Sequence, residues 1–360
     1  MPVECLLKTM NLFVEGIVKT LLVLVLCAGS QAQAPAVPPA PEGARLREAR
    51  SLLDRGSASE AERVVRAFLN ERPDSAEAHF LLGYVLFRQI QSDAERNAEA
   101  FRDDYQFTRR LHAKSQFQDA AARASLAEFT EGAKFHAPSA FDLKIVALDY
   151  VLLGDYANAD KWLTRSLQLE PGDAQAWYYL GRAKYNENRF AEAIAAFEEC
   201  SKRSAKSVRI EENLGLAYAG LGRTDEAIAA YKTAIALEEN TSVKDPGPFI
   251  DMGDLLLDQN RAEDAVAYLR QAVEIAPKNS KAHELLGKAY ARQNQLPLAQ
   301  RELETAILLA PQIASLHCML GPIYRKQGLR KEAKAEFESC SLLSSPNSPL
   351  ENAPQQSLRP

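Results

Sequence analysis

"WYYLGRAKYNENRFAEAIAAFEEC", residues 177–200, predicts two short helices in succession. In each half, residues suited to one buried helix face recur at intervals of three and four. The first face comprises Trp177, Leu180, Ala183 and Lys184, and the second comprises Phe190, Ala193, Ile194 and Phe197. Asn186 and Asn188 separate the two patterns, so a tight turn joins antiparallel helices. Small residues at Gly181 and Ala193 predict that the two backbones approach closely, near the lower end of the usual range of ~8–10 Å.

The same pattern returns along the chain at a spacing of 34 residues. The Leu-Gly pair recurs as Leu82-Gly83, Leu180-Gly181, Leu214-Gly215, Met252-Gly253, Leu286-Gly287 and Leu320-Gly321, with Val146-Ala147 as a weaker copy. The small residue that opens the second helix recurs as Ala159, Ala193, Ala227, Ala265, Ala299 and Ala333. The turn residue recurs as Gly154, Asn188, Gly222, Asn260, Asn294 and Gly328. Prolines, which cannot continue a helix, close units at Pro73, Pro171, Pro277 and Pro311.

These columns resemble the tetratricopeptide repeat family, whose unit is a 34-residue helix-turn-helix. The resemblance implies an all-α, right-handed superhelical solenoid of about eight units over residues 42–343. The units are expected at 42–75, 76–139, 140–173, 174–207, 208–241, 246–279, 280–313 and 314–347. The second unit carries an insertion at about 91–120, and residues 242–245 are extra.

The insertion is expected to form an additional helix on the second repeat. Ser92 and Glu95 have the spacing of a capping box. A helical stripe follows, made of Ala94, Ala98, Phe101 and Tyr105. The helix would either dock a partner or be a tolerated elaboration.

The N-terminal residues 1–34 have the pattern of a secretory signal peptide. Lys8 and Lys19 precede an apolar run over 21–28, and small residues follow. Cleavage is expected near 30–34, followed by a Pro/Ala-rich linker over 35–41. An uncleaved anchor is disfavoured because the apolar run is far shorter than the ~20 residues needed to span a bilayer. We therefore expect an exported protein, periplasmic or secreted, without a stable membrane span after cleavage.

The composition is that of an ordinary soluble protein, with 46% hydrophobic and 25% charged residues and a net charge of −5. Removal of residues 1–34 takes away two basic and two acidic residues and leaves that charge unchanged. No global basic field favours nucleic acid. Residues 344–360 are rich in Pro and Ser and predict a disordered tail. Cys200, Cys318 and Cys340 would remain after cleavage, and whether Cys318 pairs with Cys340 is left open.

The sequence predicts a non-catalytic protein without a cofactor or bound metal. His79, His283 and His317 share the repeat column of Trp177, which favours core packing. A remote alternative is a hydrolase or redox enzyme that uses Cys318 and His317, although consecutive helix residues point in different directions.

Binding of a protein or peptide in a concave groove is the leading hypothesis, as the family resemblance implies. The groove residues expected from units two to four are aromatic or basic: Phe80, Tyr84, Phe87, Lys144, Tyr178, Arg182 and Tyr185. In the alternative interpretation, the insertion folds back and covers them as core. A basic face in units seven and eight would take an acidic ligand: Lys281, Lys288, Arg292, Arg325 and Lys326. The expected role is a scaffold in the assembly of a cell-envelope complex, and the alternative is a self-associating structural protein.

Overall fold

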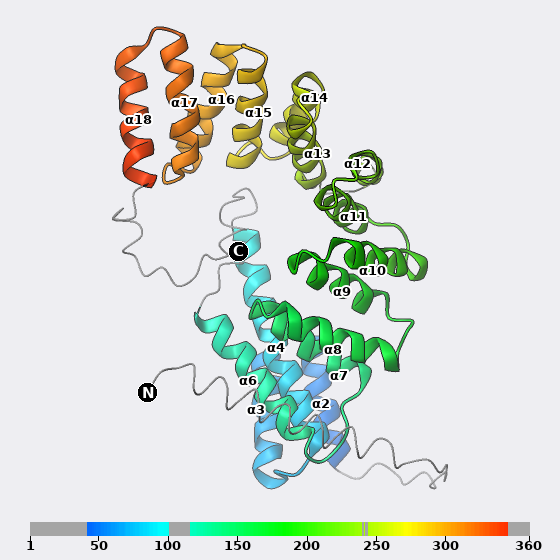
Figure 1. Cartoon of the computed structure of the whole chain (residues 1–360). Coiled ribbons are helices and arrows are strands. Elements are labelled where there is room, and N and C mark those ends of the chain that lie inside the picture. Colours follow the sequence, from blue (N-terminus) through cyan, green and yellow to red (C-terminus); the bar gives the residue numbers. More distant parts are fainter. Residues whose placement is uncertain (1–41, 101–115, 240, 242–243, 345–360) are drawn as a thin grey trace, which may run out of the picture. The chain divides into compact units, whose positions relative to one another are not determined.

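A computed structural model describes residues 42–100, 116–239, 241 and 244–344 (Figure 1). These residues form α-helices joined by turns and irregular segments. The predicted signal peptide, linker and residues 345–360 of the predicted tail lie outside the described residues, as does the centre of the insertion.

Consecutive helices pair as hairpins within the predicted units. The first four pairs are α2 (Glu42–Asp54) with α3 (Ala58–Glu71), α4 (Ala76–Ala100) with α6 (Gln116–Gly132), α7 (Ala140–Leu152) with α8 (Tyr156–Leu169), and α9 (Ala174–Asn186) with α10 (Phe190–Arg203). The last four are α11 (Val208–Gly220) with α12 (Thr224–Glu238), α13 (Gly247–Asp258) with α14 (Ala262–Ile275), α15 (Ser280–Arg292) with α16 (Leu296–Leu309), and α17 (Ala314–Lys326) with α18 (Arg330–Ser344). The prediction of an all-α helical solenoid is confirmed.

The contacts divide the described residues into two compact units. The first unit contains residues 42–85 and 127–138, and the second contains residues 86–100, 116–126 and 139–344. In the second unit the hairpins from α7 to α18 follow one another in chain order, green to red in Figure 1.

The turns between paired helices are made as the repeat columns predict. All six predicted turn residues adopt a positive φ, between 58° and 82°. The three that are not glycine are Asn188, Asn260 and Asn294. Asparagine tolerates this left-handed conformation better than other residues with a side chain. One left-handed residue therefore reverses the chain at the same point in each of these hairpins.

The close approach predicted at Gly181 is present, but the space is filled by a side chain rather than by the backbone near Ala193. A Cβ atom on Gly181 would lie 2.5 Å from Cε1 of Phe197, whose ring is fully buried. The same relation joins Gly215 to the ring of Tyr231. The repeated glycine is thus the socket for a large residue sixteen positions later.

The predicted helix start at Ser92 is wrong. Helix α4 runs from Ala76 to Ala100 without a break, so Ser92 lies in its interior. A true capping box begins α7, where Ser139 Oγ accepts from the Asp142 amide at 3.2 Å and the Asp142 carboxylate accepts from the Ser139 amide at 2.8 Å.

The first helix of each hairpin lies on the inner side of the second unit. There, the first helices of successive hairpins contact each other: α7 with α9, α9 with α11, α11 with α13, α13 with α15, and α15 with α17. Within the described part of this unit, the second helices of successive hairpins make no such contacts. The stack therefore curves with the first helices on the concave face.

Candidate functional site

Two of the predicted groove residues are part of the core. Phe80 is 8% exposed and stacks on Phe129 of α6, with ring centroids 6.1 Å apart. Phe87 is 4% exposed. The expectation that these two rings line an open groove is therefore corrected, and for Phe80 the covering element is the helix that follows the insertion. Tyr84, on the same helix, is half-buried.

Lys144 is engaged within the chain and joins two repeats. Its Nζ donates to Asp173 Oδ2 at 2.7 Å and to Gln175 Oε1 at 3.1 Å. Burial would raise the pKa of Asp173, but Lys144 and the Ala176 amide hold that pKa below its ordinary value. This lysine locks α7 to the start of α9 and is not a free ligand for a partner.

Helix α9 presents the remaining predicted groove residues. Tyr178, Arg182 and Tyr185 are all half-buried on the concave face. Tyr178 meets Tyr179 edge-on at 5.5 Å between centroids, and Tyr185 meets Phe190 edge-on at 5.4 Å. Burial raises the pKa of both Tyr178 and Tyr185. Aromatic side chains and arginine are the residue types enriched at the energetic centres of protein interfaces.

The next two first helices add acidic side chains that the sequence interpretation missed. Glu212 of α11 and Asp251 of α13 are half-buried, and no hydrogen bond or ion pair joins either carboxylate to another described residue. Burial and the negative charges of Asp251 and Asp245 together raise the pKa of Glu212 to about 8. Burial and the charges of Asp254 and Asp245 raise the pKa of Asp251 to about 7. Glu212 follows Tyr178 by one repeat of 34 residues. This equivalent position in the repeat could have identified Glu212 as a residue of the concave face.

The predicted basic face at the C-terminal end is largely neutralised within the chain. Lys281 pairs with Glu284 at 3.1 Å, and Lys288 lies 3.7 Å from Asp254. Of the others, Arg292 donates to the Leu257 carbonyl and Arg325 lies over the Phe337 ring at 5.6 Å, while Lys326 is exposed. The face therefore offers much less free positive charge than its sequence suggests.

The histidine column is structural, as predicted. His283 Nδ1 faces Glu302 Oε2 at 2.7 Å, and its Nε2 faces the Pro277 carbonyl at 2.9 Å. A carbonyl and an ionised carboxylate only accept hydrogen bonds, so this geometry favours a doubly protonated imidazolium. His79 and His317 repeat the arrangement with a glutamate and a proline carbonyl of their own units.

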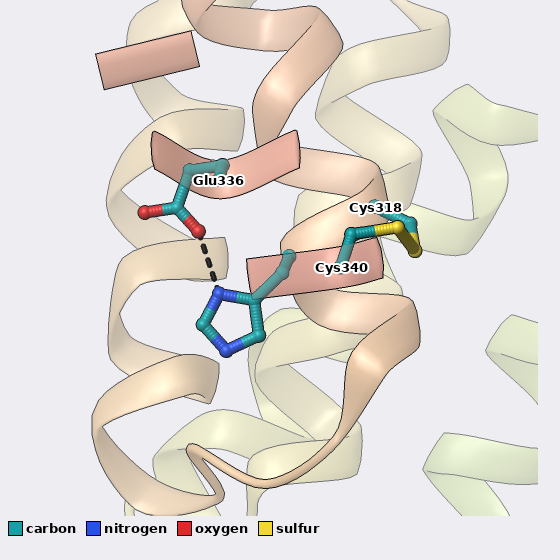
Figure 2. The surroundings of a disulfide bond; sticks show 4 residues. Cys318, Glu336 and Cys340 are labelled. Atoms are coloured by element: carbon teal, nitrogen blue, oxygen red, sulfur yellow. Dashed lines mark hydrogen bonds and ion pairs between the residues drawn. A yellow bond between two sulfur atoms is a disulfide. The ribbon is translucent and has the colours of Figure 1, made fainter. Parts of the chain in front are cut away.

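Cys318 and Cys340 form a disulfide that joins α17 to α18 (Figure 2). Figure 2 also shows Glu336 of the same hairpin, which accepts from His317 at 2.6 Å. The bond answers the question left open by the sequence. It also removes the thiol on which the remote Cys318–His317 enzyme hypothesis depends, because the thiolate is the nucleophile. Cys200 is buried and free.

The described residues contain no helix that is both long and apolar enough to cross a membrane. In the same part of the chain, no three His, Cys, Asp or Glu side chains come together in a way that could hold a metal ion.

Comparison with known families agrees with this architecture. Models described as tetratricopeptide repeat match residues 46–107, 206–278, 256–317 and 314–347, which together span more than half of the chain. A model described as anaphase-promoting complex, cyclosome, subunit 3 matches residues 134–234. The chain belongs to the tetratricopeptide repeat family.

Individual proteins resemble parts of the chain. The cytochrome c-type biogenesis protein CycH of Pseudomonas aeruginosa is 26% identical over 129 residues, which make up 34% of this chain and 30% of CycH. The human protein O-mannosyl-transferase TMTC3 is 25% identical over 151 residues, 38% of this chain and 16% of TMTC3. The chain thus spans less than a third of the length of either relative.

Solved structures share the fold at low identity. A tetratricopeptide repeat protein from Parabacteroides merdae ATCC 43184 has a TM-score of 0.54 and 16% identity, and the match covers 78% of this chain and 98% of that protein. PilW, a widely conserved type IV pilus biogenesis factor, has a TM-score of 0.51 and 18% identity, with coverage of 58% and 96%.

Proposed function

We propose that this protein is a non-catalytic scaffold that binds a protein or peptide on the concave face of α9, α11 and α13. The observation that carries the proposal is the combination of half-buried aromatic and charged groups on that face. Tyr178, Arg182 and Tyr185 stand beside carboxylates that have no partner among the described residues. Aromatic residues and arginine dominate the energetics of protein interfaces, and a surface with unsatisfied charge gains most from a complementary partner.

We further propose that the protein works outside the cytosol. A disulfide between Cys318 and Cys340 supports this, because such bonds persist in oxidising compartments and are rare in the cytosol. The signal-peptide pattern of residues 1–34 points the same way. CycH is a cytochrome c-type biogenesis protein, and the partial likeness to it supports a scaffold that serves the assembly of a cell-envelope complex.

The experiment is a crosslinking pull-down from native envelope with the wild-type chain and two variants. Arg182→Glu places a repelling charge on the concave face, and Leu308→Glu places the same charge on α16, where Leu308 is 81% exposed. The proposal expects the same captured proteins with wild type and Leu308→Glu, and their loss with Arg182→Glu. Circular dichroism verifies that both variants fold. If Arg182→Glu retains every partner, the binding surface lies elsewhere on the protein. Sedimentation of the purified chain would then test self-association.

A further inference from the structure

The concave face of α11 and α13 carries an unbalanced group of carboxylates. Glu212 lies against Gly247 at the start of α13, where a Cβ atom would collide with its Oε1. Asp251 follows one turn later on α13, close enough for its charge to raise the pKa of Glu212. Both keep contact with solvent, and neither has a hydrogen bond or ion pair to another described residue.

A tyrosine hydroxyl on α12 adds a further polar group to this part of the second unit. Tyr231 of α12 is 1% exposed, and its ring fills the socket at Gly215. Its hydroxyl makes no hydrogen bond to any other described residue. Burial raises the pKa of Tyr231, and the negative charges of Asp251 and Glu212 raise it as well, so the hydroxyl lies within the field of these carboxylates. Its oxygen is not among the polar atoms that are buried without a partner, so it remains accessible and can complete a ligand site.

The surrounding charges do not neutralise the group. Asp245 and Glu238 add negative charge around Glu212, and Asp254 adds it around Asp251. Arg209 of α11 partly offsets Glu212, but no ion pair joins them. Lys288 of α15 lies 3.7 Å from Asp254, and Lys244 donates to the backbone carbonyl of Glu238. Acidic charge therefore remains in excess at the centre of the concave face.

We propose that this site binds a lysine or arginine side chain of the partner, between the carboxylates of Glu212 and Asp251 and the hydroxyl of Tyr231. The proposal rests on the proposed function and specifies the chemistry of its ligand. The ligand is a basic segment of a protein, because a positive charge complements the excess acidic charge on this face.

The donor count of such a ligand suits the site. A lysine ammonium carries three donors and no acceptor, and an arginine guanidinium carries five donors. Glu212, Asp251 and Tyr231 supply oxygen acceptors from three different helices. The ring of Tyr185 lies beside them, where a cation gains a further attraction to the aromatic face. Ligand binding would thus give hydrogen-bond partners to these three groups.

The test uses an array of acetylated, amidated twelve-residue peptides of random composition, probed with the purified full chain. The site variant is Glu212→Gln/Asp251→Asn. The matched control is Glu263→Gln/Glu274→Gln, which removes the same charge from exposed positions on α14. Peptides bound by the wild type and the control should be enriched in lysine or arginine, and the site variant should lose that enrichment.

Two further outcomes distinguish failure of the cation site from failure of the proposed peptide-binding function. Bound peptides without basic enrichment, or enrichment that persists in the site variant, overturn the cation site and leave peptide binding intact. Absence of any bound peptide with wild type counts against both the cation site and the proposed function.

The pH dependence gives a second readout on a peptide selected from the array. A bound cation requires ionised carboxylates, so the affinity of the wild type should rise at least about tenfold between pH 6 and 8. The site variant should lack this rise, while the α14 control should keep it. In the free protein, the raised carboxyl pKa values mean that stability is lost as pH rises from about 4 to 8. The site variant should therefore melt at a higher temperature than wild type at pH 9 and at a similar temperature at pH 4. A lower melting temperature at pH 9 would overturn the assignment, because the carboxylates would then be structural.

Discussion

Cys318 and Cys340 are covalently joined across the two helices of the last hairpin, with their Cα atoms 5.1 Å apart. Among the described residues, this hairpin packs against one other hairpin, formed by α15 and α16. The disulfide closes a loop with a sequence separation of 22 residues and limits the unfolded states of α17 and α18. It therefore adds a covalent link to a hairpin that contacts a single neighbouring hairpin in the described part of the chain.

Reduction of this bond is expected to destabilise the last hairpin by about 3 kcal/mol, the value typical of a loop of this length. Hydrogen exchange with and without reductant measures the change residue by residue. Protection should fall in α17 and α18 and stay unchanged in α9 and α11. The variant Cys318→Ser/Cys340→Ser should behave like the reduced protein, while Cys200→Ser should still respond to reductant. Equal protection before and after reduction would show that the bond contributes nothing.

The pair of His283 and Glu302 should make stability depend on pH in a defined window. Burial opposes the charged forms, but each partner overcomes it, so the pKa of His283 is raised and that of Glu302 is lowered. The histidine contribution is complete below its unfolded pKa of about 6.5 and is lost as pH rises through the higher folded value. The glutamate contribution is complete above about 4.3 and is lost as pH falls through the lower folded value.

The variant Glu302→Gln should accordingly lose about 1–3 kcal/mol near pH 5.5 and less at pH 9, where the imidazole is neutral. Thermal unfolding at a series of pH values measures the difference from wild type. A difference that does not change between pH 5.5 and 9 would mean that the histidine is uncharged in the folded protein.

Gly181→Ala is expected to destabilise its hairpin by about 1–3 kcal/mol, because the new methyl group overlaps the ring of Phe197. Gly172→Ala is the control, since a Cβ atom there meets nothing within 4 Å and its φ is not in the positive range. The double variant Gly181→Ala/Phe197→Leu should recover part of the loss by relieving the overlap. If Gly181→Ala and Gly172→Ala unfold alike, the socket does not constrain the packing.

Lys144 and Asp173 are expected to be energetically coupled across the junction of two repeats. Lys144→Met leaves a mostly buried carboxylate without its cation and should cost about 2 kcal/mol. Asp173→Asn keeps an N-cap for α9 while removing the charge. A double-mutant cycle isolates their coupling, which should be about 1–3 kcal/mol. A coupling near zero would assign the cost of Lys144→Met to lost packing.

The sequence predicted the repeats well because each requirement is local. A turn residue with a positive φ is most easily glycine or asparagine, as at Gly154 and Asn188. A large side chain between the paired helices, such as Phe197, requires a glycine on the facing helix. These constraints recur at a fixed period and can be read without any long-range information. The pairing of Cys318 with Cys340 could not be decided, since it depends on how two helices rotate against each other.

The candidate site was predicted only in part. Tyr178 and Tyr185 were selected because aromatic residues on a concave column are unusual, and their role in binding stays a prediction. Phe80 was misjudged because its burial depends on the position of Phe129, after an insertion whose path the sequence does not reveal. Glu212 and Asp251 were overlooked because most acidic residues are solvated. What distinguishes these two is that no ion pair or hydrogen bond joins either carboxylate to another described residue.

The most direct test of the account is site-specific photocrosslinking in the native cell envelope. A photoreactive amino acid is placed at Tyr178, at Tyr185 and, as the outer control, at Leu308. The account predicts that the first two positions crosslink to the same protein and that position 308 does not. A partner that crosslinks from position 308 and from neither tyrosine position would contradict the claim that the concave face of α9, α11 and α13 is the binding surface.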